Sequence, residues 1–221
     1  FGGLTWDDVI KVEVSGYGAS ANAVINGQAD ASMGSSVSSI FNKTNASPRG
    51  LFFPPMPHND EAGWKRAIAT APHFAKAVVT NFIGSSDSNK SFEGMNYPYP
   101  IFVTMKTTSD DLSYHLTKAV MNNYDQFKDS GPGMDGYQLS NQNFSWIFPY
   151  HPGAVKFYKE KGVWTSKHDK HNANLIKRQD VLAKAWQKTL KANLSGDAFK
   201  KKWLENRASS LKAAGMPNAY N

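Results

Sequence analysis

The sequence contains no cysteine among its 221 residues, so disulfide bonds, thiolate metal sites and cysteine nucleophiles are all excluded. It also contains no run of about 18 apolar residues, the length that a membrane-spanning helix needs. Its first residues lack the basic and then apolar layout of a secretory signal peptide. We therefore expect a soluble protein of one large domain or two small lobes, long enough to bury a substantial core without covalent cross-links.

Arginine is scarce: it accounts for four of the 25 basic residues, and lysine accounts for the other 21. The net charge of +7 is unevenly distributed. Residues 1–150 contain ten basic and thirteen acidic side chains, whereas residues 151–221 contain fifteen and five, which gives the last third a net charge of +10. Because base recognition and bidentate phosphate binding depend mainly on arginine, these lysines favour a solvated helical face over a nucleic-acid site.

Motifs for nucleotide binding and for serine hydrolysis are missing as well. The chain has no GxxxxGK[ST] phosphate loop and no GxSxG nucleophile elbow, and GYGAS at residues 16–20 has too few glycines for a dinucleotide fingerprint. His168 and His171 have the spacing of two metal ligands on one helix face. However, no further histidine lies nearby in the sequence, and the polar residues 166–172 favour a solvated loop. We predict no catalytic residue, no metal site and no cofactor.

The first fifty residues alternate between strand and helix patterns. Residues 9–14 alternate apolar and polar side chains as a half-buried strand does, and Gly27 is typical of a helix end. The expected elements here are strands at residues 9–14, 29–33 and 50–53, and helices at residues 19–26 and 34–41. This order predicts an α/β fold with a parallel sheet and right-handed crossovers.

The rest of the chain is predicted to be mainly helical. Capped or amphipathic helical patterns occur at residues 61–70, 108–128, 151–162, 175–190 and 195–215, and residues 101–105 have the pattern of a further strand. The tryptophan and leucine stripes of the last two helices indicate packing faces rather than a cofactor site.

Two turns rich in glycine and serine precede helices of the first fifty residues: SGYGAS at residues 15–20 and GSS at residues 34–36. Free N–H groups at a helix N-terminus bind anions, and the carboxyl ends of parallel strands meet at one sheet edge. Caps and tight turns explain the same residues as well, but two such openings at one edge favour a small carboxylate ligand. The expected ligand-binding residues are Ser15, Tyr17, Gly18, Ser20, Gly34, Ser35 and Ser36.

In this arrangement, backbone N–H groups and the hydroxyls of Ser20, Ser35 and Ser36 would hold one carboxylate, and Tyr17 would cover the solute. A dicarboxylate would normally need an arginine fork for its second carboxylate. No arginine is adjacent to either turn in the sequence.

Three segments resemble, in the same order, motifs of the TAXI family of solute-binding proteins, which serve TRAP transporters. NGQADA at residues 26–31 is similar to the glycine-and-acid turn of the family, and SDDLSYHLTKA at residues 109–119 is similar to its helix "dlpedlvYelTkal". HPGAVKFYKEKG at residues 151–162 resembles the motif "HpGAikYYkEkG", which is the most specific of the three. The resemblance covers residues 1 to about 164.

The resemblance implies a two-lobed, hinged receptor of the periplasmic-binding-protein-like type II fold, with parallel-rich sheets. Such a receptor binds a small carboxylate, namely an amino acid, keto acid or dicarboxylate, and delivers it to a TRAP-type membrane permease without catalysis. The implied partners are the solute and the permease subunits, and nucleic acid is not among them. The receptor is expected to be a monomer in the periplasm. Family members extend further at the N-terminus, so the resemblance also implies a shortened chain without its signal peptide.

The resemblance further implies a role for each part of the chain. The expected parts are residues 1–50 as an α/β lobe and crossover, residues 51–107 as the return segment of the other lobe, residues 108–164 as helices that pack across the lobes, and residues 165–221 as a basic helical extension. A loose counterpart of the family turn "PaGtY" at residues 92–97 makes Tyr97 a further candidate for the pocket wall. His151 is expected only to begin a helix.

Two other classes of function remain open. An enzyme on the same scaffold would use a serine or histidine of the cleft as a base, and a histidine with a strongly shifted pKa would then face a pocket. A nucleic-acid or membrane-surface module would use the basic C-terminal helices, and its binding would depend steeply on salt.

Overall fold

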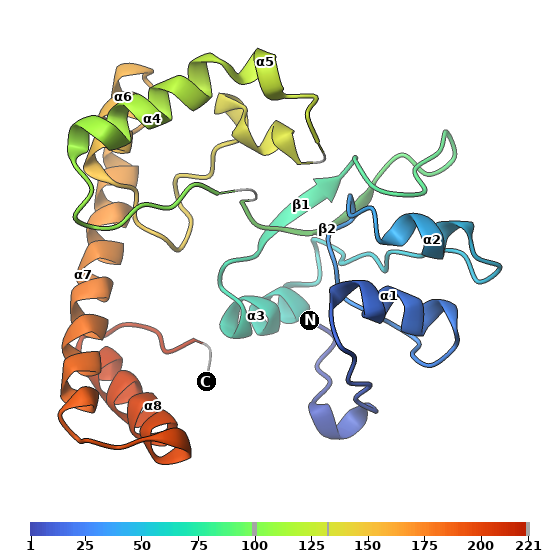
Figure 1. The fold of residues 1–221 in the computed structure, drawn as a ribbon, viewed down its shortest axis with the longest axis horizontal. Helices are drawn as coiled ribbons and strands as arrows, with labels where there is room; N and C mark the ends of the chain where they lie inside the picture. Colours follow the sequence, from blue (N-terminus) through green and yellow to red (C-terminus); the bar gives the residue numbers. More distant parts are fainter. Residues whose placement is uncertain (99–100, 132, 220–221) are drawn as a thin grey trace. The chain divides into compact units, whose positions relative to one another are not determined.

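The computed structural model describes residues 1–98, 101–131 and 133–219. The chain divides into two compact units: unit 1 comprises Phe1–Tyr97 and Ser130–Gly133, and unit 2 comprises Pro98–Asp129 and Met134–Asn221. Figure 1 follows the elements along the chain. No helix within the described ranges is long and apolar enough to cross a membrane. The assignment of residue ranges to two lobes stays a prediction.

Unit 1 combines short helices with one small sheet. In chain order its elements are η1 (Trp6–Asp8), α1 (Tyr17–Ile25), α2 (Phe41–Ala46), α3 (Glu61–Thr70), β1 (Ala75–Val79) and β2 (Phe92–Asn96). The strands pair antiparallel, with Ala77 opposite Gly94. At the start of α3 the Asp60 carboxylate accepts a hydrogen bond from the N–H of Gly63 at 2.8 Å, and Trp64 is buried. The predicted helices at residues 19–26 and 61–70 are confirmed as α1 and α3.

The parallel sheet expected for the first fifty residues is not formed in the described part of the chain, whose one sheet is the antiparallel β1–β2 pair. The four segments predicted as strands, at residues 9–14, 29–33, 50–53 and 101–105, are extended or irregular. Ile10 is 94% exposed. Alternation marks a segment that can form a strand, but a strand forms only where a neighbour supplies hydrogen-bond partners. These four predictions are therefore wrong, and the two strands that do form were not predicted.

The helix expected at residues 34–41 begins later than predicted. The N–H of Ser38 bonds to the carbonyl of Ser35 at 2.9 Å, and the N–H of Phe41 bonds to the carbonyl of Ser38 at 3.0 Å. These consecutive turns occupy the serine-rich stretch, so α2 starts at Phe41. Serine competes with helical hydrogen bonds through its own side chain, which explains the delay.

Four phenylalanines form the core of unit 1. Phe53 lies at the centre of this phenylalanine cluster: its ring centroid is 6.2 Å from Phe41, 6.0 Å from Phe82 and 5.5 Å from the stacked ring of Phe92. Phe41 and Phe82 are buried. Aromatic pairs at these separations add to the free energy of burial itself, so the cluster joins α2 to β2 without a larger sheet.

Unit 2 is helical, as predicted. Its elements are α4 (Asp110–Asn122), α5 (Tyr124–Phe127), η2 (Met134–Tyr137), η3 (Leu139–Asn141), α6 (Pro152–Glu160), α7 (Ser166–Leu190) and α8 (Gly196–Ala213). Ser109 caps α4 by accepting a hydrogen bond from the N–H of Leu112 at 3.2 Å. Gly162 and Gly215, with φ of 70° and 66°, follow the ends of α6 and α8 in the left-handed conformation that glycine favours.

The HPGA segment joins α6 to the beginning of α4. The His151 Nδ1 accepts a hydrogen bond from the N–H of Gly153 at 3.3 Å, which leaves the proton on Nε2 to be donated to the carbonyl of Thr108 at 3.0 Å. A Cβ on Gly153 would collide with the carbonyl oxygen of Asp110 and lie 2.7 Å from the nitrogen of Tyr114. The expectation that His151 begins a helix is confirmed.

α7 begins earlier than predicted, because residues 166–172 are helical rather than a loop. Thr165 and His168 form a reciprocal capping box, in which the His168 Nδ1 accepts a hydrogen bond from the N–H of Thr165 at 3.1 Å. Asn172 then makes two side-chain hydrogen bonds with the backbone of Tyr150, at 2.7 and 3.3 Å. Capping and this tertiary contact together stabilise a polar first turn that hydrophobic periodicity does not reveal.

The core of unit 2 is a second group of aromatic side chains, centred on the buried residues Phe157, Tyr158 and Trp164. Tyr150 packs against Tyr158 and Trp164, with ring centroids 5.7 and 5.4 Å apart. Burial raises the pKa of Tyr150 to about 12 and also raises the pKa of Tyr158, because the phenolate would lose its hydration.

We predict that Gly153→Ala destabilises unit 2 by about 2 kcal/mol or more, because the new methyl group must push α4 and α6 apart. Hydrogen exchange measured by mass spectrometry should show faster exchange in peptides from both helices. Gly131→Ala is the control, since a Cβ there meets no atom within 4 Å. Equal exchange in the wild type and in Gly153→Ala would contradict the close contact.

A second prediction concerns alkaline pH. A tyrosine whose pKa is raised in the folded state favours folding below its unfolded pKa of 10.0, and this contribution is lost as the pH rises from there towards about 12. Urea denaturation at a series of pH values should therefore show unit 2 losing stability above pH 10. Tyr150→Phe should make the decline shallower, and an unchanged slope in that variant would count against the assignment.

Candidate functional site

The first predicted ligand turn, at residues 15–20, contains the N-terminus of α1, which is open. Gly16 precedes the helix in an extended conformation, and no side chain caps it. Its carbonyl accepts the hydrogen bond from the N–H of Ser20 at 3.1 Å. A Cβ on Gly16 or on Gly18 would meet no atom within 4 Å, so the first turn of α1 faces free space on the glycine side. Backbone N–H groups at such a helix end can accept an anionic group.

Tyr17 connects the two glycine-rich turns. Its hydroxyl accepts a hydrogen bond from the N–H of Ser35 at 3.0 Å, and its ring meets the edge of Phe41 at 6.4 Å. A Cβ on Gly34 would collide with the Tyr17 hydroxyl and would lie 2.5 Å from the ring of Phe41. The structure therefore brings Tyr17, Gly34 and Ser35 together, and we call these three residues the tyrosine junction.

The hydroxyl groups around the junction differ in what they can still donate. Ser20 donates to the carbonyl of Tyr17 at 2.7 Å, and Ser36 donates to the carbonyl of Asn81 at 3.3 Å. In the described chain, no hydrogen bond engages the hydroxyls of Ser15 and Ser35. The Tyr17 hydroxyl also keeps its own proton, since it acts as an acceptor towards Ser35. Three hydroxyl donors, on Ser15, Tyr17 and Ser35, thus remain available on these two turns.

Tyr97, the remaining predicted residue, has its described ring contacts elsewhere in unit 1. Its ring centroid lies 5.8 Å from His73 and 5.6 Å from Phe74, next to β1. The residues that sequence reasoning missed are Phe41, which supports the ring of Tyr17, and Asn81, which holds Ser36. No sequence signal identifies Asn81, because it lies 45 residues from its partner.

The tyrosine junction carries no charge of its own. Arg49, the arginine nearest to α1 in the sequence, lies at the other end of the helix, where it donates to the carbonyl of Val24 at 3.3 Å and approaches Asp30 at 3.9 Å. Among the described residues, no ion pair or cation–π contact involves Tyr17, Gly34 or Ser35. Any anion bound here would be held by neutral donors and by the dipole of α1.

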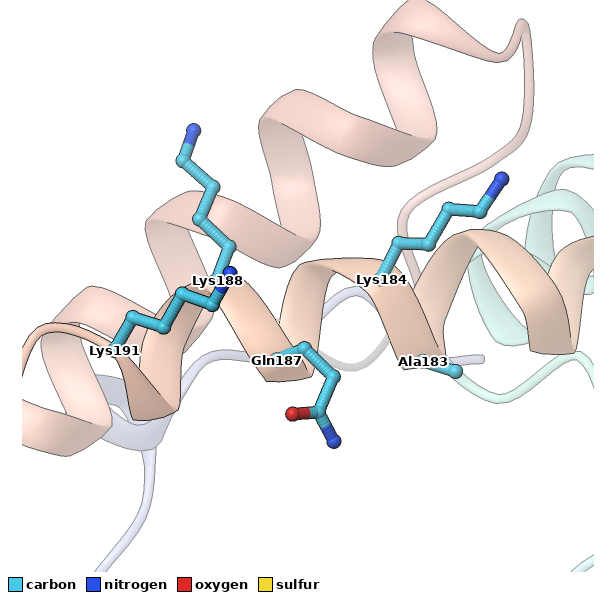
Figure 2. A pocket seen from close by; sticks show the side chains of 5 residues that line it. All are labelled: Ala183, Lys184, Gln187, Lys188 and Lys191. Carbon is cyan, nitrogen blue, oxygen red and sulfur yellow. The ribbon is translucent and has the colours of Figure 1, made fainter.

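The two histidines with metal-ligand spacing are engaged in other contacts. His168 belongs to the capping box of α7, and the Nε2 of His171 lies 2.6 Å from the carbonyl oxygen of Trp146. Over residues 1–98, 101–131 and 133–219, no group of three histidine, aspartate or glutamate side chains has an arrangement that could hold a metal. A shallow hollow on α7, lined by three lysines (Figure 2), shares no residue with the predicted ligand site.

Comparison with known families supports a periplasmic-binding-protein-like fold and a solute-binding function in general. A family model described as "NMT1-like family" matches residues 1–162. This is a periplasmic-binding-protein-like family, whose function in general is solute binding. Because the match covers well over half of this chain, the chain belongs to the NMT1-like family. Neither a comparison with curated proteins nor one with solved structures found a match.

The matched span ends at the last residue of the HPGAVKFYKEKG segment. It therefore includes α1 to α6 and the tyrosine junction, whereas α7 and α8 lie outside it.

We predict that Tyr17→Phe exposes the amide of Ser35 while keeping the aromatic packing on Phe41. The lost hydrogen bond is worth about 1 kcal/mol, so the Ser35 amide should exchange with solvent about fivefold faster in NMR measurements. Tyr124→Phe, in which a tyrosine that packs on Phe127 loses its hydroxyl, should leave that exchange rate unchanged. An unchanged rate in Tyr17→Phe as well would mean that the junction does not hold in solution.

Proposed function

We propose that this protein is an extracytoplasmic receptor that binds a small carboxylate solute and delivers it to a TRAP-type permease, as the resemblance to the TAXI family implies. The solute would be an amino acid, a keto acid or a dicarboxylate. The observation that carries the proposal is the tyrosine junction, in which two turns from different parts of the chain meet beside an open helix N-terminus. The NMT1-like match supports solute binding in general.

Each residue of the site has a role in this proposal. The N–H groups of Tyr17 and Gly18 would receive one carboxylate at the start of α1, and the hydroxyls of Ser15 and Ser35 would donate to it. The Tyr17 hydroxyl would donate its free proton to the solute. The hydroxyls of Ser20 and Ser36, which now bond to carbonyls, would contribute after rotation.

The neutral character of the junction has a consequence for affinity. Because no lysine or arginine contacts it among the described residues, binding would depend on short hydrogen bonds rather than on attraction between charges. Such binding varies little with salt, unlike binding to a charged surface. Residues 92–97, which include Tyr97, would form a separate wall of the pocket.

The resemblance to the TAXI family implies further features of this receptor. The receptor would have two hinged lobes of the type II fold with parallel-rich sheets, and it would act in the periplasm as a monomer without catalysis or cofactor. The NMT1-like match over residues 1–162 supports a periplasmic-binding-protein-like fold in general, although residues 9–14 and 101–105 form no strand in the described structure.

The test is thermal melting against a panel of amino acids, keto acids and dicarboxylates. A ligand that binds only the folded state, at about 100 times its dissociation constant, stabilises that state by about 2.7 kcal/mol and raises the melting temperature. We expect a selective rise that is abolished by Tyr17→Phe combined with Ser35→Ala. The matched control is Tyr124→Phe combined with Ser85→Ala, which keeps the junction.

Two outcomes would overturn the proposal. A rise that persists in the junction variant would place the ligand elsewhere, and no rise for any member of the panel, with the protein folded, would argue against a carboxylate receptor.

A further inference from the structure

The helices outside the family match carry a row of lysines on one face. Lys170, Lys177, Lys184, Lys188 and Lys191 follow one another along α7 and its C-terminal cap. Their spacings of seven, seven, four and three residues place them on the same side of a helix. The row is roughly 30 Å long at the rise of an α-helix, and all five residues are exposed. Figure 2 shows three of them on successive turns. We call this set the lysine row.

A different side of α7 packs against α8. Ala185 and Thr189 are buried there, and the Thr189 hydroxyl donates to the carbonyl of Ala185 at 2.9 Å while accepting a hydrogen bond from Asn206 of α8 at 3.0 Å. Leu211 of α8 is completely buried. The lysine row therefore projects away from a well-packed helical hairpin, which holds the charges in a fixed line.

The acidic residues of α7 do not neutralise the lysine row, because lysines outside α7 already pair with them. Asp169 lies 2.9 Å from the Nζ of Lys159, on α6, and also accepts a hydrogen bond from Trp164. Asp180 lies 3.5 Å from the Nζ of Lys106. No ion pair in the described chain involves a member of the lysine row. The positive charge of the lysine row is therefore available to a partner outside this hairpin.

The two arginines of the hairpin are also engaged internally. Arg178 donates to the carbonyl of Pro217 at 2.7 Å, and Arg207 donates to the carbonyl of Ala219. Both bonds hold the C-terminal segment against the hairpin. The lysines of the row are therefore not supplemented by a free arginine of the hairpin. Lysines act as hydrated point charges and lack the planar fork with which arginine recognises bases or binds a single phosphate.

Exposed apolar side chains lie at the end of the hairpin where the lysines are densest. Leu190 is 43% exposed and Leu194 is 42% exposed, on either side of Lys191 in the sequence. Trp186, one turn before Leu190, is 40% exposed and packs edge-on against Phe199 and Trp203 at 5.3 and 5.1 Å. Exposed leucines at the lysine-rich end of a hairpin suit the boundary between headgroups and acyl chains, whereas a nucleic acid offers such leucines no apolar environment.

We propose that the α7–α8 hairpin docks the protein on an anionic phospholipid bilayer. The straight lysine row matches a flat negative surface, to which each lysine contributes additively, and Leu190 and Leu194 enter the interface at the turn of the hairpin. The proposed solute site lies in unit 1 and shares no residue with this surface, so the two proposals stand independently.

The experiment is co-sedimentation of the full chain with phosphatidylcholine vesicles, with and without about 30% phosphatidylglycerol, at about 20 mM and about 500 mM NaCl. We expect binding to the anionic vesicles only, and much weaker binding at high salt. Lys184→Gln combined with Lys188→Gln and Lys191→Gln should weaken partitioning on the order of 100-fold. Circular dichroism should show that the helices remain.

Two further variants separate the lysine row from net charge and from the leucines. Lys43→Gln combined with Lys65→Gln and Lys90→Gln removes the same charge from exposed positions of unit 1 and should bind as the wild type does. Leu190→Asn combined with Leu194→Asn should weaken binding at both salt concentrations.

The proposal is overturned if the unit 1 control loses as much affinity as the lysine-row variant, or if neutral vesicles bind equally well. Binding to duplex DNA that depends on the lysine row, without binding to anionic vesicles, would also overturn it and would assign the surface to nucleic acid.

Discussion

The close contact between the beginnings of α4 and α6 is the constraint on which unit 2 depends. Because residue 153 is glycine, the first turn of α6 lies against the backbone of Asp110 and Tyr114, and His151 reinforces the contact by bonding to Thr108. This contact directs Phe157 and Tyr158 into the aromatic core, where Trp164 joins them just before α7 begins. A histidine beside a proline, which suggests a catalytic base, is therefore a cap that joins two helices.

Unit 1 is organised by side chains more than by its backbone. Its sheet has only two strands in the described residues, and the phenylalanine cluster connects that sheet to α2. Tyr17 extends the cluster to the surface, since its ring packs on Phe41 while its hydroxyl bonds to Ser35. The tyrosine junction therefore derives its geometry from the core, which is how a rigid support can present donors to a ligand.

Charge is distributed differently on the two units. The tyrosine junction presents neutral donors, which act over short distances and discriminate by shape and hydrogen bonding. Lys159 and Lys106, which lie outside α7, pair with Asp169 and Asp180 of α7. The lysine row therefore keeps its full charge. Such a row attracts an anionic surface over a distance of about one Debye length, roughly 10 Å at 0.1 M salt. The proposed solute binding and the proposed membrane docking could then be varied independently.

The sequence by itself determined most of the helices, because helical hydrogen bonds and caps join residues only a few positions apart. α1, α3, α6 and α8 could be predicted on that basis, as could the glycine-rich turns. The strands could not be predicted in this way. Residues 9–14 have the alternation of a strand but no partner strand, whereas β1 and β2 pair although no local pattern predicts either of them. In the candidate site, tertiary structure decided that the Tyr17 hydroxyl meets Ser35 and that Ser36 bonds to Asn81, contacts that span 18 and 45 residues. It likewise decided which lysines are paired, because an ion pair depends on distance in space and not on spacing in the chain.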